Sequence, residues 1–421
     1  MQFQAPRGTS DILPENQKYW ETVTEKAFLT AKKFGYSKID TPIFENTELF
    51  MKGIGTSTDI LEKETYTFPD RGNDSLTLRP EGTAPVCRAY LEHGMNNLPL
   101  PVKLFYISSN FRYERPQSGR YRQFHQFGVE AIGEPDPYID AEVIELAWNF
   151  LKELNLSDLI LSINSIGDPQ CRPKYIENLK TYYQSCEQQL CKDCKRRLIS
   201  NPLRLLDCKI DSCQPLIENS PKTIDHLCES CSQHWESLKT LLKKINIDFK
   251  VENKLVRGLD YYTKTVFEIA PPNEMRTNVI TGGGRYDGLI EQLGGPQTPG
   301  IGFAIGLERV IENMKSSNIS PNKSFPPLIL VAHIGDKAKE ESVKLASSIR
   351  SAGFSAILGP SRGLKSQLRY ASSVKASYSV IIGEDELVEG KFILRNMLEG
   401  EQQKCTLQEI IEILSSHQHK Y

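Results

Sequence analysis

Four arginines lie close together in one short stretch of the chain, residues 106–130: Arg112, Arg115, Arg120 and Arg122. Two runs of alternating polar and aromatic residues flank a tip at 115–120 that contains Pro and Gly, and this pattern predicts a long β-hairpin. Guanidinium groups bind phosphate through paired hydrogen bonds and stay charged at any working pH, so such a hairpin suits a dense anion. A solvated basic hairpin that packs its aromatic face into a core explains the same pattern equally well.

Composition limits the class of protein only broadly. A chain of 421 residues predicts about two to four domains, and its contents of 39% hydrophobic and 25% charged residues are ordinary for a folded protein. A net charge of −2 argues against non-specific coating of nucleic acid, but it allows a local site for RNA. The first residues show no signal-peptide pattern, and no apolar run reaches membrane length. We therefore expect a cytoplasmic protein.

Helices and strands must hold the hairpin in place. Apolar spacing predicts helices over 15–34, 84–93 and 140–154, strands over 36–44, 159–163 and 266–269, and a second hairpin over 67–78. Pro42 has no N–H to donate, so its strand lies at an edge or meets a partner subunit. The rigid loop 78–84 can present Glu81 and Thr83 to a ligand, and a capping turn for the next helix is an equally good interpretation.

Seven of the ten cysteines fall between residues 186 and 231. In a long chain without a signal-peptide pattern, this clustering favours thiols or a metal site over a disulfide framework. The spacings are Cys191-x-x-Cys194, Cys208-x4-Cys213 and Cys228-x-x-Cys231. Two Cys-x-x-Cys pairs roughly 30 residues apart are typical of a tetrahedral zinc site, but the extra thiols leave the ligand set open, and reduced thiols without metal remain an alternative. Polar, helical sequence over 167–247 predicts an inserted helical module around them.

Two glycine-rich stretches, 281–288 and 300–306, follow this module. Such glycine density lets a backbone or a ligand approach closely. A helix expected from Leu307 places Arg309 in its first turn, within reach of the phosphates of a nucleotide on the glycine strand. The spacing differs from the dinucleotide-binding fingerprint, and the sequence has no Gly-x4-Gly-Lys-Ser/Thr loop. Any nucleotide would therefore be held by arginine side chains.

Pro326-Pro327 mark a domain boundary. Beyond it, strands expected at 328–332, 354–358 and 378–382 alternate with helices expected at 337–351 and 364–374. This alternation predicts a small α/β domain with a mainly parallel sheet over 326–421. A basic trio on one side of a predicted helix can reach RNA phosphates, although a solvated helix face explains it more simply; it consists of Arg362, Lys365 and Arg369.

Together these segments resemble a class II aminoacyl-tRNA synthetase, and over nearly the whole chain they resemble the histidyl-tRNA synthetase family of the bacterial type. Residues 106–130 are similar to motif 2 of the class, the helix and strand over 15–44 to motif 1, and Gly300–Arg309 to motif 3. Leu255–Tyr262 and Gly283–Gly288 are similar to the two histidine-specific signatures. His333-Ile-Gly335 is similar to part of a class I signature, but Asp336 replaces its second His.

The resemblance implies an α+β fold, in which an antiparallel sheet is flanked by helices and joined to a helical insertion and a C-terminal α/β domain. The catalytic domain would cover residues 1–325, and its insertion 167–247 would contact the tRNA acceptor arm. Residues 326–421 would bind the anticodon. The expected protein is a cytoplasmic homodimer, joined through motif 1. It activates L-histidine with ATP and Mg²⁺ to histidyl-adenylate, and it transfers histidine to the 3′ end of tRNA(His).

The resemblance also assigns the site residues. Arg112 and Arg257 are expected to be catalytic at the α-phosphate, Arg257 in place of a metal ion. The expected ATP-binding residues are Arg112, Glu114, Arg120 and Arg309. The expected histidine-binding residues are Glu81, Thr83, Arg112, Gln126, Glu130, Arg257, Tyr261, Tyr262 and Tyr286. For the three tyrosines, plain core packing is the alternative, and the ligands of any metal, including structural zinc at the cysteines, stay open.

Three other functions fit parts of the pattern. A regulatory paralogue that binds histidine as a signal, as a partner of ATP phosphoribosyltransferase, usually lacks the C-terminal domain and the arginine-bearing signature, and this chain keeps both. Another class II specificity, such as threonyl or prolyl, would lack the signature at Leu255–Tyr262. A general RNA-binding module would not need Arg257 and Arg309 beside a histidine pocket.

Overall fold

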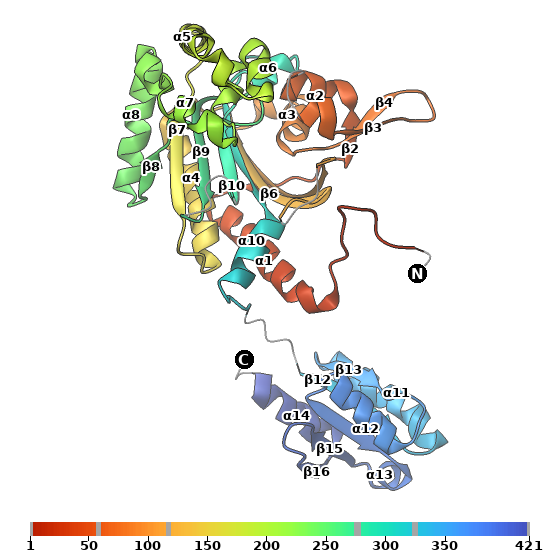
Figure 1. Cartoon of the computed structure of the whole chain (residues 1–421). Coiled ribbons are helices and arrows are strands. Elements are labelled where there is room, and N and C mark those ends of the chain that lie inside the picture. The colour runs from red at the N-terminus through yellow and green to blue at the C-terminus, as the bar shows by residue number, and fades with distance from the viewer. Residues whose placement is uncertain (1–2, 56–59, 115–118, 273–278, 322–326, 419–421) are drawn as a thin grey trace. The chain divides into compact units, whose positions relative to one another are not determined.

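The computed structural model describes residues 3–55, 60–114, 119–272, 279–321 and 327–418. The chain divides into two compact units, Met1–Pro321 and Asn322–Tyr421 (Figure 1). Expectations that involve Arg115 and the boundary at Pro326 fall outside the described residues. Among the described residues, no helix is both long and apolar enough to cross a membrane.

The first unit is built on a large sheet that is antiparallel at its centre. In spatial order its described strands are β1 (Ser37–Lys38), β5 (Val102–Phe111), β6 (Gln123–Ile132), β11 (Gly300–Gly306), β10 (Thr281–Arg285), β9 (Thr263–Ala270), β7 (Ile160–Ser165) and β8 (Phe249–Val251). The pairs at the two edges, β1 with β5 and β7 with β8, are parallel. The pairs between them are antiparallel. The predicted antiparallel sheet and the hairpin around 106–130 are therefore confirmed.

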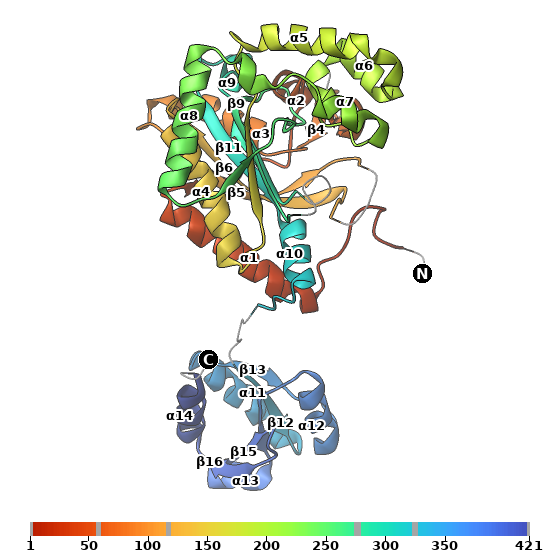
Figure 2. The same ribbon diagram turned by 60° about the vertical axis from the view of Figure 1, so that its left-hand side comes forward.

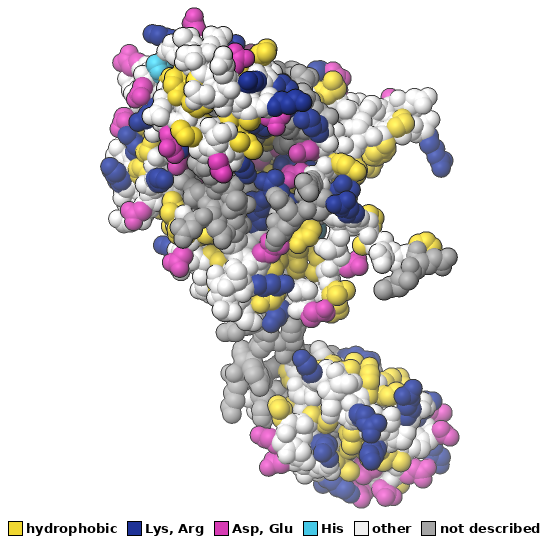
Figure 3. Space-filling view, viewed as in Figure 1, with side chains coloured by type: hydrophobic (Ala, Val, Ile, Leu, Met, Phe, Trp, Pro, Cys, Tyr) yellow, Lys and Arg dark blue, Asp and Glu magenta, His cyan; other side chains and the backbone are white. Residues whose placement is uncertain are grey.

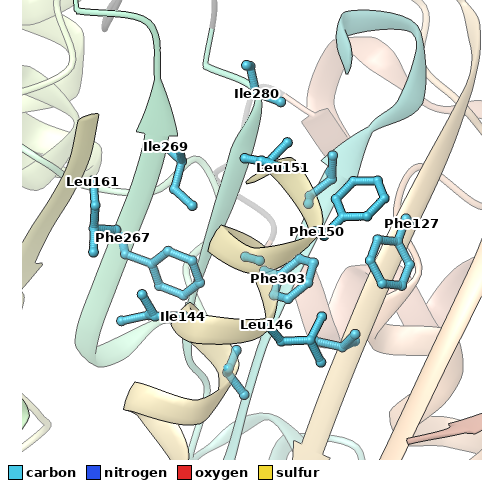
Figure 4. Close-up of a cluster of buried hydrophobic side chains, with 14 of the residues drawn as sticks. Phe127, Ile144, Leu146, Phe150, Leu151, Leu161, Phe267, Ile269, Ile280 and Phe303 are labelled. Carbon is cyan, nitrogen blue, oxygen red and sulfur yellow. The ribbon is translucent and has the colours of Figure 1, made fainter. Parts of the chain in front are cut away.

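Helices cover one face of this sheet with an apolar core (Figure 2). They are α1 (Pro14–Lys33), α4 (Pro137–Glu153), α8 (Glu229–Lys244) and α10 (Leu307–Ser316). Figure 4 shows Ile144 and Phe150 of α4 beside Phe127 and Phe303 of the sheet. Because successive strand residues point to opposite faces, Phe127 of β6 packs against the helices, whereas Gln126 on the same strand lines a cavity on the other face.

The opposite face carries a second apolar cluster. Its helices are α3 (Thr83–Glu92) and α9 (Leu289–Gln292). A small separate sheet has the strand order β2 (Phe44–Asn46), β4 (Ser75–Leu78) and β3 (Tyr66–Pro69). The helix α2 (Thr47–Ile54) packs against β2 and β4, the short helix η1 (Ile60–Glu64) against α2, and the short helix η2 (Met95–Asn97) against α3. The hairpin predicted over 67–78 is confirmed as β3 and β4, with the side chain of Asp70 accepting hydrogen bonds in its turn.

The single strand predicted over 36–44 is wrong. The structure divides this segment between β1, at the edge of the large sheet, and β2, in the small sheet. Pro42 lies in the irregular link between them, and its missing N–H cannot continue a ladder. Two different sheets therefore use the two ends of this segment.

Residues between β7 and β8 form the helical insertion that the sequence pattern predicts. Its elements are α5 (Arg172–Ser185), η3 (Glu187–Gln189), α6 (Lys192–Ser200), η4 (Pro202–Leu205), η5 (Asp211–Cys213), α7 (Gln214–Glu218), η6 (Thr223–His226) and α8. The helices α5, α6 and α7 lie together in both views (Figures 1 and 2). Their apolar core is small, with eleven buried residues, which matters because so little buried surface stabilises a fold only weakly.

The second unit contains a five-stranded sheet with helices packed on it. In spatial order its strands are β13 (Ser355–Leu358), β12 (Leu328–His333), β14 (Tyr378–Ile382), β15 (Phe392–Asn396) and β16 (Gln402–Cys405). Its helices are α11 (Asp336–Ser351), α12 (Leu364–Ser373), α13 (Glu384–Glu389) and α14 (Leu407–Gln418). The first three strands are parallel as predicted, but the hairpin of β15 and β16 makes the sheet mixed. Sequence reasoning missed β16 because its first three residues are polar and exposed.

Candidate active site

A cavity of about 440 Å³ opens on the face of the large sheet that α1 and α4 leave free. Figure 3 shows Lys and Arg side chains gathered around the hollow in the first unit. Eleven of the twelve predicted site residues line this cavity: Glu81, Thr83, Arg112, Glu114, Arg120, Gln126, Arg257, Tyr261, Tyr262, Tyr286 and Arg309. The structure thus brings together residues from five separate stretches of the sequence. Glu130, the twelfth, lies directly behind the wall.

Glu81 is fixed by the start of a helix. Its carboxylate accepts hydrogen bonds from the backbone N–H of Thr83 (2.7 Å) and of Ala84 (2.8 Å), in the first turn of α3. Tyr261 Oη donates to the same carboxylate at 3.5 Å. Burial raises the pKa of Glu81, and the backbone hydrogen bonds oppose that rise. Helix capping and cavity lining are therefore both correct descriptions of Glu81, because the cap holds the carboxylate in the cavity wall.

Glu130 is fully buried on β6 and is held by three hydroxyl groups. Thr83 Oγ1 donates at 2.8 Å, Tyr286 Oη at 2.7 Å and Tyr106 Oη at 3.3 Å. Burial raises the pKa of Glu130 to about 8, although these hydrogen bonds lower it in part. Glu130 therefore acts on the cavity through Thr83 and Tyr286, whose side chains line it.

The three predicted tyrosines are packed as well as exposed to the cavity. Tyr261 lies 4.7 Å from Tyr262 and 6.0 Å from Tyr286, measured between ring centroids. All three belong to the second apolar cluster and also line the cavity. Core packing and a place in the cavity wall are thus not exclusive for these residues.

Three guanidinium groups lie near one another in the cavity wall. Arg112 Nε donates to the carbonyl oxygen of Pro80 at 2.9 Å, and Arg120 pairs with Glu114 at 3.2 Å. Arg309 donates to the backbone carbonyl oxygens of Gly119 and Val279, and the carboxylates of Glu114 and Glu312 lie near its charge. Burial lowers the pKa of Arg309, and the nearby charges of Arg120 and Arg112 lower it further. Such a concentration of positive charge is suited to a polyphosphate.

Arg122 differs from the other hairpin arginines. Its guanidinium carbon lies 3.7 Å from the centroid of the Tyr113 ring, and Arg122 is not among the residues that line the cavity. The expectation that all four arginines face one anion is therefore wrong for Arg122, whose guanidinium packs on the Tyr113 ring and donates to the carbonyl oxygen of Glu114.

Two features position Arg257, the carboxylate of Glu268 and the space that Gly282 leaves free. Its guanidinium forms an ion pair with Glu268 of β9 and lies 5.7 Å from the centroid of the Tyr262 ring. Its Nε atom is buried and has no hydrogen-bond partner among the described residues. A Cβ atom on Gly282 of β10 would overlap the guanidinium. The glycine-rich strand therefore gives Arg257 its place on the sheet.

Sequence reasoning missed several residues that shape the cavity. Glu268, the partner of Arg257, alternates with apolar residues of β9, and this alternation was the signal that could have found it. Phe124 lines the cavity with its ring centroid 5.4 Å from the Arg112 guanidinium carbon, and it shares a strand face with Gln126. The insertion contributes Leu206, Asp207, Cys208, Lys209 and Gln214. No local pattern marked the insertion segment, because only the tertiary fold brings it to the cavity.

Two neighbouring residues of the second histidine-specific signature, Gly283–Gly288, have different roles. Arg285 is fully buried and forms an ion pair with Asp140 of α4, which also accepts hydrogen bonds from His234 Nε2 (2.8 Å) and Thr265 Oγ1 (2.6 Å). Its neighbour Tyr286 points to the cavity. Arg285 thus joins α4, α8, β9 and β10, and it fixes the strand that presents Tyr286.

The two Cys-x-x-Cys pairs do not meet, contrary to the expectation of one site formed by both. Cys191 and Cys194, at the start of α6, lie with Cys208 and Cys213, whereas Cys228 and Cys231, at the start of α8, lie with Asp168 and Cys171. The two helices begin in different parts of the insertion, so each pair completes its own group of four. All ten cysteines are free thiols.

In the second unit, the basic trio Arg362, Lys365 and Arg369 is exposed on and just before α12. His333 ends β12, where its backbone N–H and C=O both bond to the side chain of Gln367. This position is structural, as expected for a chance match to a class I signature.

A helix-backed antiparallel sheet whose open face holds converging arginines from a hairpin, a glycine-rich strand region and a helix start is the architecture of a class II aminoacyl-tRNA synthetase. The family model described as Histidyl-tRNA synthetase matches residues 8–181 and 204–310, and that described as Anticodon binding domain matches residues 328–417. The chain belongs to the histidyl-tRNA synthetase family.

Individual relatives agree along the full length. A histidine–tRNA ligase of Dehalococcoides mccartyi is 53% identical over 97% of this chain and 98% of its own. One of Caldicellulosiruptor saccharolyticus is 46% identical over 100% and 99%. The solved structure of apo S. aureus histidyl-tRNA synthetase has a TM-score of 0.82 and 36% identity, with 98% of this chain and 99% of that chain covered.

The raised pKa of Glu130 predicts a pH-dependent stability. Between pH 4.5 and about 8, folded Glu130 keeps a proton that the unfolded chain releases. The free energy of unfolding should therefore fall as pH rises through this window, by up to about 1.4 kcal/mol per pH unit. Glu130→Gln cannot ionise, so its curve should lack this fall. Urea unfolding of both proteins across the window measures it. Exposed Glu187→Gln should follow the wild type, and parallel wild-type and Glu130→Gln curves would contradict the assignment.

Proposed function

We propose that this chain is a histidine–tRNA ligase, which activates L-histidine with ATP, releases pyrophosphate and transfers histidine to the 3′ end of tRNA(His). One observation carries the proposal. A single cavity is lined both by carboxylates and phenols, among them Glu81 and Tyr286, and by the three arginines Arg112, Arg120 and Arg309. The first set suits an ammonium group and an imidazole ring, and the second suits the phosphates of ATP. The cavity thus has room and chemistry for both substrates side by side.

Histidine is held by the polar wall around Glu81 and Glu130. The fixed Glu81 carboxylate and the hydroxyls of Thr83 and Tyr261 offer acceptors to the α-ammonium group. The Tyr286–Glu130 pair, together with Gln126 and Tyr262, offers partners to both imidazole nitrogens. Because these groups are buried, an amino acid whose side chain cannot hydrogen-bond would leave them unpaired, and this penalty is the basis of selection.

The arginines of the cavity explain how the adenylate can form. The carboxylate of histidine attacks the α-phosphorus in line, the new C–O–P bond forms and pyrophosphate leaves with the bonding electron pair. Negative charge grows on the α-phosphate oxygens in the transition state, so fixed cations stabilise that state most. We assign Arg112 and Arg257 to the α-phosphate and Arg309 to the γ-phosphate, with Arg120 and Glu114 also at ATP. Glu268 is a positioning residue that orients Arg257.

Mg²⁺ is proposed to enter bound to the phosphates of ATP, where it shields their charge. The nearby carboxylates already have partners in the chain. Glu114 bonds Arg120, Glu268 bonds Arg257, and Glu308 accepts from the N–H and the ring of His125. We therefore propose that arginines do the main work of phosphate binding.

The remaining parts of the chain are assigned to tRNA. We propose that residues 167–247 contact the acceptor arm and that residues 326–421 bind the anticodon, with the exposed basic trio on α12 at the phosphates. We also propose that the protein works in the cytoplasm, where its product supplies translation.

Arg257→Ala should abolish most of the adenylation rate. Loss of a preorganised cation at the developing charge should slow histidine-dependent adenylate formation by about 10²–10³-fold, with a much smaller change in histidine affinity. Rapid-quench measurement of pyrophosphate release gives the rate. Arg88→Ala, which removes an arginine paired with Glu45 outside the cavity, should leave it unchanged. An equal effect of both substitutions would contradict a catalytic role.

Gly282→Ala should reproduce part of this defect without touching a charge. The added methyl group would overlap the Arg257 guanidinium and displace it, so adenylation should slow while the fold is kept. Gly288→Ala is the matched control, because its Cβ meets nothing closer than Gln292 Nε2 at 4.0 Å. Melting temperature and pyrophosphate release are measured together. A normal rate in Gly282→Ala would show that Arg257 need not occupy this place.

A homodimer through the motif 1 region is also proposed. Large apolar side chains of motif 1 and of the adjoining small sheet region are 39–50% exposed: Phe28, Leu29, Ile43 and Phe44 in motif 1, Met51 in α2 and Phe68 in β3. Exposed apolar side chains of this kind mark protein interfaces. Wild type should sediment at twice 47.7 kDa, and the Ile43→Glu, Phe44→Glu double variant as a monomer. Leu398→Glu, which is exposed in the second unit, should remain dimeric. A monomeric wild type would overturn the proposal.

A further inference from the structure

The insertion contains two separate groups of metal-ligating side chains outside the residues assigned to catalysis. In each group the four candidate ligand atoms all lie within 4.8 Å of one another. The first group consists of Cys191, Cys194, Cys208 and Cys213, and the second of Asp168, Cys171, Cys228 and Cys231. The Histidyl-tRNA synthetase family model leaves out residues 182–203, so two cysteines of the first group fall outside the family match.

The geometry of the first group fits a tetrahedral ion. Cys191 Sγ lies 3.9 Å from Cys208 Sγ, which is too long for a disulfide. With Zn–S bonds of about 2.3 Å, a tetrahedral site requires sulfur atoms about 3.8 Å apart. Backbone N–H groups already donate to two of the sulfurs, Cys194 N–H to Cys191 Sγ and Cys191 N–H to Cys213 Sγ, both at 3.4 Å. Such bonds orient and stabilise thiolate ligands.

The second group joins the two ends of the insertion. Asp168 and Cys171 follow β7, whereas Cys228 and Cys231 begin α8. Asp168 Oδ1 lies 3.4 Å from Cys171 Sγ and 3.9 Å from Cys228 Sγ. The next residue, Arg172, donates to the carbonyl oxygen of Tyr262 at 2.7 Å. Three thiols and one carboxylate at these spacings form a closed donor set that zinc accepts.

We propose that the insertion binds two zinc ions, one at the four cysteines of the first group and one at Asp168, Cys171, Cys228 and Cys231, and that the first ion orders a wall of the catalytic cavity. The small apolar core of the insertion explains why metal cross-links are needed, since a few buried residues cannot stabilise so long a segment.

The link from the first ion to the cavity runs through the segment between its ligands. Cys208 and its neighbours Leu206, Asp207 and Lys209 line the cavity. In the same segment, Arg204 donates to the carbonyl oxygen of Gly258 at 3.2 Å, and Asn201 Nδ2 donates to Asp260 at 2.9 Å. Both acceptors follow Arg257 within three residues of the sequence. This role of the first ion rests on the proposed function, whereas the number of ions does not.

Metal content of the untagged full-length protein tests the stoichiometry. Mass spectrometry of the elements should find about two zinc ions per chain in wild type and in Cys186→Ser, whose thiol is in the insertion but in neither group. Cys208→Ser and Cys228→Ser should each lose one ion, and the double variant both. One zinc ion per chain in wild type, absent from either single variant, would indicate a single shared site, and no zinc, or iron in its place, would overturn the proposal.

Wild-type protein keeps the test valid if a variant fails to fold. A mercurial reagent should release two zinc ions in two steps, and Co²⁺ added after reduction should give thiolate charge-transfer and tetrahedral d–d absorption bands. Absence of these bands would contradict the two zinc sites.

Hydrogen exchange of residues 202–214 should accelerate in zinc-free protein and in Cys208→Ser, but not in Cys228→Ser or Cys186→Ser. Unchanged exchange there would refute the role of the first ion at the cavity, whatever the protein's activity.

Discussion

The catalytic architecture depends on glycines of β10 and β11, which leave room on one face of the large sheet. On β10 and β11, a Cβ atom at Gly282 would overlap Arg257, and one at Gly302 would overlap Glu130. Glycine is required at these positions by close approach, not by an unusual backbone angle. The glycine positions let a buried carboxylate and a buried guanidinium lie directly on the sheet. The apolar core on the other face holds the strands rigid.

The ionisable groups of the cavity are held in place by different kinds of partner. Glu81 is tied to the start of α3 and Glu130 to hydroxyl groups, while Arg309 bonds only to backbone carbonyl oxygens among its described partners. Arg257 and Arg120 instead have their charges balanced by acids, Glu268 and Glu114 respectively. The acidic groups and the arginines are therefore preorganised before a substrate binds. Preorganised groups stabilise a transition state without the cost of reorientation.

Patterns among neighbouring residues predicted those features of the site that a short segment determines by itself. The alternation around Phe111 and Gln126 predicted the hairpin, and the glycines predicted close approach. Roles came from resemblance, since no pattern in the residues alone relates Glu81 to Arg257. Three errors share one cause. The strand through Pro42, the position of Arg122 and the pairing of Cys191–Cys194 with Cys228–Cys231 each depended on long-range packing, which periodicity and spacing do not contain.

The central claim is that this cavity selects histidine and activates it with ATP. Amino-acid-dependent exchange of pyrophosphate into ATP, measured on the wild-type protein with each of the protein amino acids in turn, tests it most directly. The account predicts exchange with histidine alone. Exchange with another amino acid would contradict the assigned pocket, and histidine binding without any exchange would contradict catalysis and favour a regulatory protein that only senses histidine.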